Sequence, residues 1–139
     1  MPDLDDVFAG LDRLRIELPS WGFADTGTRF GKYLQDAAAL TLEDKLDDAA
    51  EVNRVTGCCP SVAVHVQWDF EGDEPGDATQ MAAARGLRLG SVNPNLFQSQ
   101  CYRLGSVANE DASIRRQAIE HLLRSVELGR AIGSDVLSL

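Results

Sequence analysis

The side chains of this sequence best suited to chemistry lie in one short stretch, Ser61–Asp69, which reads S-V-A-V-H-V-Q-W-D. Apolar and polar residues alternate along it with the period of a β-strand. Valines therefore occupy one face, while the other face ends in the imidazole of His65 and the amide of Gln67. Both groups donate and accept hydrogen bonds, which suits a hydrophilic pocket. The stretch predicts a strand whose carboxyl end carries a site.

Several polar residues near this end also have purely structural interpretations. His65 on a strand of valines can be a core histidine whose nitrogens are satisfied by hydrogen bonds. Asp69 can be a carboxylate close to a ligand, or the cap of the loop that follows the strand. Glu17, on an earlier strand, is interpreted as the ion-pair partner of an interior arginine such as Arg15. Residue types alone leave the alternatives for His65 and Asp69 open.

Two further strands show the same arrangement. Arg13–Leu18 and Leu87–Asn93 each alternate, with Glu17 opposite the apolar face of one and Ser91 and Asn93 opposite that of the other. An ordinary doubly wound sheet meets helices on both faces and has near-continuous apolar strands. A polar second face on three successive strands instead indicates an α/β barrel, whose site lies at the carboxyl ends of its strands.

Helices are expected between the strands. Thr41 is a predicted N-cap of a helix that ends before Gly57, a natural left-handed C-cap. A short helix is expected over 77–85 and a long one over 110–132. The apolar stripe expected on the long helix consists of Ile114, Ala118, Leu122, Val126 and Gly129. His121 lies beside this stripe, and we expect it at the surface.

The element order is therefore β-α-β-α-β-α-β, which predicts a parallel sheet with crossover helices. A fourth strand starts at Val136–Leu139 and is not completed. We expect an α/β fold that forms the first half of a TIM (β/α)8 barrel, truncated at strand 4. Residues 1–139 would form part of one domain, with 1–12 as a leader segment before the first strand.

Composition and charge exclude several classes of function. The chain has 139 residues, 44% of them hydrophobic and 25% charged, as in a soluble globular domain. Its net charge of −9 argues against nucleic acid or an anionic membrane as a partner. No run approaches the roughly 20 apolar residues of a membrane span, and the acidic N-terminus is not a secretory signal. The three cysteines lack C-x-x-C spacing, so we expect reduced thiols in a cytoplasmic protein.

A series of motifs, in order from about residue 13 to residue 139, resembles the bacterial L-rhamnose isomerases of the xylose-isomerase-like TIM-barrel superfamily. The motifs are P-S-W-G (19–22), G-T-R-F (27–30), V-H-V-Q-W-D (64–69), N-P-N-L-F (93–97), Y-R-L-G-S (102–106), and E-H-L-L with E-L-G-R-A-I-G-S within 120–134. The resemblance implies that His65 meets the sugar's ring oxygen and hydroxyls during ring opening. It implies apolar pocket walls at Trp21 and Phe97, which plain packing would also explain, and an inter-subunit loop aromatic at Phe30.

The resemblance also implies the reaction, the interconversion of an aldose such as L-rhamnose or D-allose with its ketose. Two divalent metal ions (Mn, Mg, Co or Zn) would assist it, held by ligands on later strands that this chain lacks. The implied partners are a small-molecule sugar and either further copies of the chain or the remainder of a longer chain. Two alternatives are a non-catalytic, self-associating half-barrel that binds a polyol and a sugar-phosphate epimerase. A missing basic phosphate-binding loop argues against the epimerase.

Overall fold

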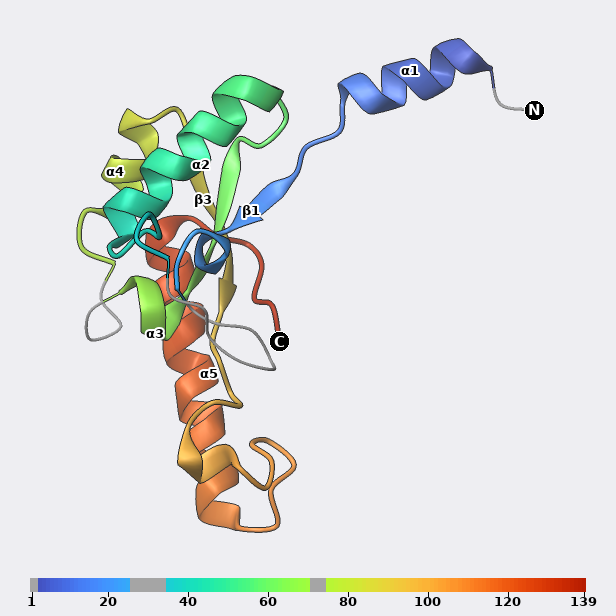
Figure 1. Ribbon diagram of the computed structural model, residues 1–139. Coiled ribbons are helices and arrows are strands. Elements are labelled where there is room, and N and C mark those ends of the chain that lie inside the picture. Colours follow the sequence, from blue (N-terminus) through green and yellow to red (C-terminus); the bar gives the residue numbers. More distant parts are fainter. Residues whose placement is uncertain (1–2, 26–34, 71–74) are drawn as a thin grey trace.

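The computed structural model of the protein describes residues 3–25, 35–70 and 75–139 (Figure 1). The strands are β1 (Glu17–Pro19), β2 (Ser61–His65) and β3 (Arg88–Asn93). The helices are α1 (Leu4–Asp12), α2 (Leu42–Thr56), α3 (Val66–Asp69), α4 (Ala78–Ala84) and α5 (Ala112–Ile132), with 3-10 turns η1 (Ser20–Gly22) and η2 (Gln100–Tyr102).

The strands form one parallel sheet in the order β1-β2-β3. Along the pairing, Leu18 stands opposite Val62 on β2, and His65 stands opposite Asn93 on β3. Beyond β3, the chain that follows α5 makes a single parallel bridge, Leu137 to Val92. The expected parallel strands in sequential order are therefore confirmed for three strands, and the expected fourth strand is present as one bridge.

The hydrophobic core lies on one face of this sheet. It joins Val62 and Val64 of β2, and Leu89 and Val92 of β3, to the inner sides of α2, α4 and α5. The helical contributions are Leu46 and Ala49, Ala78 and Ala82, and Leu128 and Ile132. The valines thus pack against helices, as their alternation predicts, and His65 points to the opposite face. This one-sided covering is compatible with part of a barrel and differs from a doubly wound sheet.

Local signals placed the ends of α2 correctly. The Thr41 side chain accepts the Asp44 N–H, and the Asp44 carboxylate accepts the Thr41 N–H, which completes a capping box. At the other end Gly57 adopts φ 69°, a left-handed conformation that only glycine takes up without strain. Thr41 and Gly57 are therefore the caps that the sequence predicted.

Two strands are shorter than expected. β1 begins only at Glu17, which pairs with Ser61, the first residue of β2. The preceding residue, Ile16, donates its N–H to the carbonyl of Cys58, which lies before β2. β2 ends at His65 because the Asp69 carboxylate accepts the His65 N–H at 2.6 Å, which turns the chain into α3. Residues 66–69 therefore form a helical turn although their apolar–polar alternation continues.

Helix α5 lies rotated from its expected orientation. Its buried residues are Ala118, His121, Ser125, Leu128, Gly129 and Ile132. Val126 of the expected stripe is exposed, and His121, expected at the surface, is buried and stacks on Tyr102 with ring centroids 6.4 Å apart. The buried side of the helix includes two small residues, Ala118 and Gly129, and Gly129 faces the Val92 side chain of β3.

The face opposite the core is crossed by one carboxylate. Glu17 of β1 accepts hydrogen bonds from the backbone N–H of Ser91, at 2.9 Å, and from the Ser91 hydroxyl on β3. A Cβ at Gly90 would overlap this carboxylate. Arg15, the expected partner of Glu17, instead donates to the carbonyls of Asp12 and Leu14. The glycine that appeared to weaken β3 therefore makes room for a link between the first and third strands.

All three cysteines are free thiols, with Cys59 buried and the other two half-buried. Within residues 3–25, 35–70 and 75–139, no helix combines the length and the apolar composition needed to cross a membrane.

Gly90→Ala is expected to lower the free energy of unfolding by about 1–3 kcal/mol, because the added methyl group displaces the Glu17 carboxylate. In a Glu17→Ala background the same change should cost much less, since the obstructing side chain is gone. Urea unfolding of the four proteins of this cycle measures the difference. Gly10→Ala is the control, because a methyl group there meets open space. Additive effects of the two substitutions would contradict the assignment.

Candidate functional site

The site is centred on the imidazole of His65, the last residue of the central strand. The side chain is 2% exposed. Its ring stacks on the indole of Trp68, with ring centroids 3.5 Å apart and planes 10° from parallel. The edge of a second indole, Trp21, lies against it at 5.8 Å. The two indoles also contact each other, at 6.5 Å, so three rings form one aromatic cluster.

The backbone places these rings by two short turns that follow neighbouring strands. Trp21 lies in η1, directly after β1 and Pro19. Trp68 lies in α3, directly after β2. Because the carboxyl ends of parallel strands meet at one edge of a sheet, two separate motifs converge there. The sequence predicted Trp21 in this region but assigned no role to Trp68.

One carboxylate fixes both turns. Asp69 is fully buried, and its Oδ2 accepts the Ser20 hydroxyl at 2.5 Å and the His65 backbone N–H at 2.6 Å. Its Oδ1 accepts the ammonium of Lys45, also buried, at 2.6 Å. Lys45 donates in addition to the Trp68 carbonyl at 3.1 Å. Asp69 therefore positions the residues on both sides of the cluster and caps the end of β2, the structural role that the sequence left open. Its role near a ligand stays a prediction.

The imidazole nitrogens form no hydrogen bond with the part of the chain that the structure describes. Within the described ranges, neither Nδ1 nor Nε2 of His65 is bonded, although both are buried. Burial lowers the pKa of His65 from 6.5 to about 4, with the positive charge of Lys45 adding to the effect and Asp69 opposing it. At neutral pH the ring is therefore uncharged, with one nitrogen that donates and one that accepts. An unsatisfied buried polar group costs free energy, so a ligand able to bond both nitrogens would be favoured.

Two pockets lie near the cluster, and of its three rings only Trp68 lines one of them, the larger. One of about 630 Å³ lies between α2, α3 and α4 and is lined in part by Gln67, Trp68 and Asp69. A smaller one of about 200 Å³ is lined by polar groups, among them Gln67, Tyr102 and His121.

The expected site residues are only partly brought together. The ring of Trp21 contacts that of His65, and its role as a wall of a sugar pocket stays a prediction. Phe97 is 67% exposed and lines a separate pocket of about 280 Å³ with Val107, Leu122 and Leu139. Phe30, the expected inter-subunit aromatic, lies outside the described residues.

Lys45, Ser20 and Trp68 are site residues that sequence reasoning missed. A lysine in an acidic helix is usually solvated, and nothing local marks Lys45 as buried. The signal that could have found Trp68 and Ser20 is their position, each within a few residues of a strand end. Their partner Asp69 becomes recognisable only when β1, β2 and α2 are placed together.

The divalent metal ions implied by the resemblance do not fit the residues present. Across residues 3–25, 35–70 and 75–139, no three His, Cys, Asp or Glu side chains are arranged to hold a metal ion. The one buried carboxylate of the site, Asp69, is already paired with Lys45. No step of the chemistry is therefore assigned to a metal within this part of the chain.

The chain is similar to two curated proteins that are named probable sugar isomerases. The chain is 36% identical, over 99% of its length, to a protein of Rhizobium meliloti named probable sugar isomerase. It is 33% identical, over 98% of its length, to a protein of the same description from Mesorhizobium japonicum. The chain spans about a third of the length of these curated relatives, 33% and 32% respectively. No family model matches the chain.

Removal of Lys45 is expected to destabilise the fold strongly, because it leaves the Asp69 carboxylate buried without its counter-charge. Lys45→Met should lower the free energy of unfolding by about 3–5 kcal/mol. The matched control is Arg54→Met, which breaks the exposed pair with Glu51 and should leave the urea midpoint nearly unchanged. Equal effects of the two substitutions would show that the Lys45–Asp69 pair is not buried in solution.

The depressed pKa of His65 predicts a specific dependence of stability on pH. Between pH 6.5 and about 4, His65 is protonated in the unfolded state and remains neutral in the folded state. The contribution of His65 is therefore complete above pH 6.5 and is lost as the pH falls toward 4, by up to about 3 kcal/mol. Urea midpoints across this window should fall less steeply in His65→Gln than in the wild type.

Proposed function

We propose that this chain is the N-terminal part of a metal-dependent aldose–ketose isomerase similar to L-rhamnose isomerase, and that it supplies part of the sugar pocket. The similarity to probable sugar isomerases about three times as long supports a longer parent protein. The parallel sheet with its core on one face supports a place in an α/β barrel. The remaining strands, and the ligands for Mn, Mg, Co or Zn, belong to the rest of that protein.

The observation that carries this proposal is the neutral, unbonded imidazole of His65 between two indoles. A pyranose has apolar C–H faces and a rim of hydroxyl groups. Trp21 and Trp68 can pack against apolar surface, and the two nitrogens of His65 can bond the rim. A charged imidazolium could only donate, so the low pKa preserves both capabilities at neutral pH.

In this proposal His65 assists ring opening. The bond between C1 and the ring oxygen breaks, C1 becomes a carbonyl carbon, and the proton of the anomeric hydroxyl is transferred to the ring oxygen. The accepting nitrogen of His65 takes a proton from a hydroxyl, and its N–H donates to the ring oxygen. Asp69 keeps the ring in place through the His65 backbone rather than through its nitrogens. The later hydrogen shift between C1 and C2 is left to the rest of the protein.

The proposal extends to the setting of the enzyme. The free thiols at Cys58, Cys59 and Cys101 are consistent with a cytoplasmic protein. A homo-oligomer is expected, with the loop that contains Phe30 reaching a neighbouring subunit's site. L-rhamnose is the substrate proposed first, and D-allose is a second aldose to be tested.

Activity distinguishes this function from a non-catalytic sugar-binding half-barrel. The 139-residue chain alone, with Mn²⁺, is expected to form no ketose from L-rhamnose or D-allose. The same chain continued by its downstream coding sequence should form ketose, and His65→Gln should lower kcat/KM by about 10²-fold or more. His121→Gln serves as the control.

Two results would count against the proposal. Turnover by the 139-residue chain would show that the metal ligands lie within it. A downstream reading frame without Glu, Asp and His at later strand ends would favour the half-barrel.

A further inference from the structure

Two thiols lie side by side at the amino end of β2, the end opposite to His65. Cys58 and Cys59 follow α2 and precede the strand, and their Sγ atoms are 3.8 Å apart. In an extended strand, consecutive side chains point to opposite faces. Here the two sulfurs are turned to the same side, close enough for one thiol to donate to the other. The chain therefore presents two sulfur ligands at one point.

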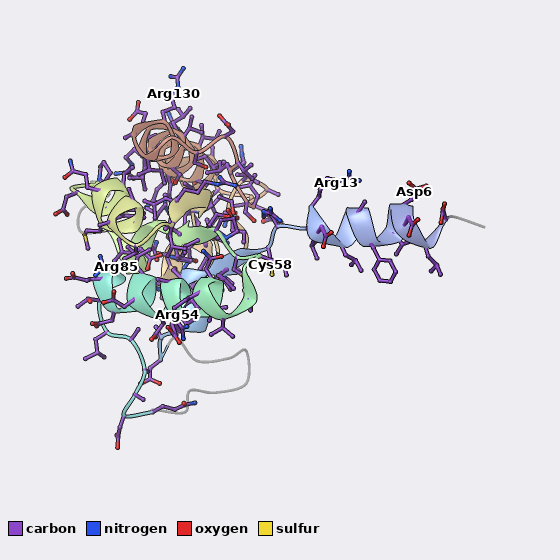
Figure 2. All side chains as sticks on the ribbon, turned by 90° about the horizontal axis from the view of Figure 1, so that it is seen from above. Asp6, Arg13, Arg54, Cys58, Arg85 and Arg130 are labelled. Atoms are coloured by element: carbon purple, nitrogen blue, oxygen red, sulfur yellow. The ribbon has the colours of Figure 1, made fainter. Side chains whose placement is uncertain are left out.

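Hydrogen bonds to two other segments hold the backbone of this pair in place. The Cys59 N–H donates to the side-chain oxygen of Asn53 on α2 at 3.0 Å. The Cys58 carbonyl accepts the Ile16 N–H at 2.8 Å. Cys58 lies where the segment that leads from α1 joins the rest of the molecule (Figure 2). Ligands that their surroundings already hold in position lose less conformational entropy when they bind.

Solvent reaches the pair through one of its members. Cys58 is half-buried, whereas Cys59 is 3% exposed. A thiophilic atom that first binds the Cys58 sulfur then lies beside the Cys59 sulfur, which is 3.8 Å away. The second bond forms within the same molecule, at a high effective concentration. The Cys59 sulfur also contacts the Thr56 hydroxyl at 3.5 Å, and this contact is easily given up because sulfur is a weak hydrogen-bonding group.

The distance between the sulfurs favours a shared bound atom over a disulfide. Two sulfurs bound at about 2.3 Å to one tetrahedral atom lie about 3.8 Å apart, which matches the 3.8 Å observed. A disulfide requires about 2.05 Å, so the sulfurs would have to move together on a backbone that is held by hydrogen bonds. The described residues contain no group of three His, Cys, Asp or Glu side chains able to hold a metal ion. The bound atom that fits therefore takes only two ligands from the protein.

We propose that Cys58 and Cys59 form a dithiol site for thiophilic atoms that bind two sulfurs, and that monosubstituted trivalent arsenic is such a ligand. Trivalent arsenic binds sulfur at a length similar to that of zinc, and a carbon group takes its third position. When R–As(OH)2 reacts with the pair, two As–S bonds form and two As–O bonds break. The two thiol protons leave with the two hydroxyl groups as water, and arsenic stays trivalent. This inference does not depend on the proposed function.

Phenylarsine oxide, which is hydrated in water to the form R–As(OH)2, is the probe for this site in the 139-residue chain. We expect native mass spectrometry to show one phenylarsenic group on each folded chain. An excess of a small monothiol should leave this group in place, whereas a small dithiol should remove it, because only a dithiol replaces both As–S bonds within one molecule.

Single cysteine variants locate the site. Cys58→Ser should raise the dissociation constant of the arsenic compound by about 100-fold or more, because the remaining thiol binds without chelation. Cys59→Ser should have the same effect, and the Cys58 variant carries the test if the buried position does not tolerate serine. Cys101→Ser is the matched control. Cys101 is as half-buried as Cys58, but its sulfur contacts the Ser99 hydroxyl and no second thiol, so this variant should bind as the wild type does.

Three outcomes would overturn the proposal. The first is a wild-type chain that takes up no phenylarsenic group until urea unfolds it, because the fold would then hide the pair. The second is a bound group that a monothiol removes as readily as a dithiol does. The third is a Cys101→Ser variant that binds as weakly as Cys58→Ser. Circular dichroism of each variant confirms that the folded state is being compared.

Discussion

The buried ion pair between Lys45 and Asp69 is the interaction on which the rest of this structure depends. A carboxylate withdrawn from water needs partners for both of its oxygens. Asp69 finds them on three different elements, because α2 supplies Lys45, η1 supplies Ser20 and the end of β2 supplies the His65 N–H. These bonds bring together segments that are far apart in sequence. They also end the central strand where the candidate site begins.

The same ion pair shapes the electrostatics of the site. Burial opposes protonation of His65 most strongly and lowers its pKa; the Asp69 carboxylate favours protonation, and the positive charge of Lys45 opposes it. The imidazole is held at the edge of the sheet by its backbone and by the stacking of Trp68, while its nitrogens remain unbonded in the described structure. Asp69 thus supports the structure, and the ring of His65 is held in place without use of its own polar atoms. In the proposed function those atoms are the ones that bond the sugar.

The two faces of the sheet are built on different principles. On the core face, Val62, Val64 and Leu89 interdigitate with three helices. On the other face, small residues such as Gly90 leave space for the Glu17 carboxylate to reach Ser91. The polar face links strands by directional bonds, and the apolar face holds the helices by burial.

The sequence by itself determined the parallel order of the strands, the caps of α2 and the face of β2 on which His65 lies. These follow from local spacing and capping chemistry, which act over a few residues. Only the tertiary structure decided that β2 stops at His65, that Lys45 is buried and that His121 faces inward. The end of β2 depends on Asp69, four residues further on, whose carboxylate is held in place by the distant residues Lys45 and Ser20. The burial of Lys45 and of His121 depends on contacts distant in sequence, with Asp69 and Tyr102 respectively. Local patterns cannot specify such contacts, because the free energy that fixes them arises only when separate elements meet.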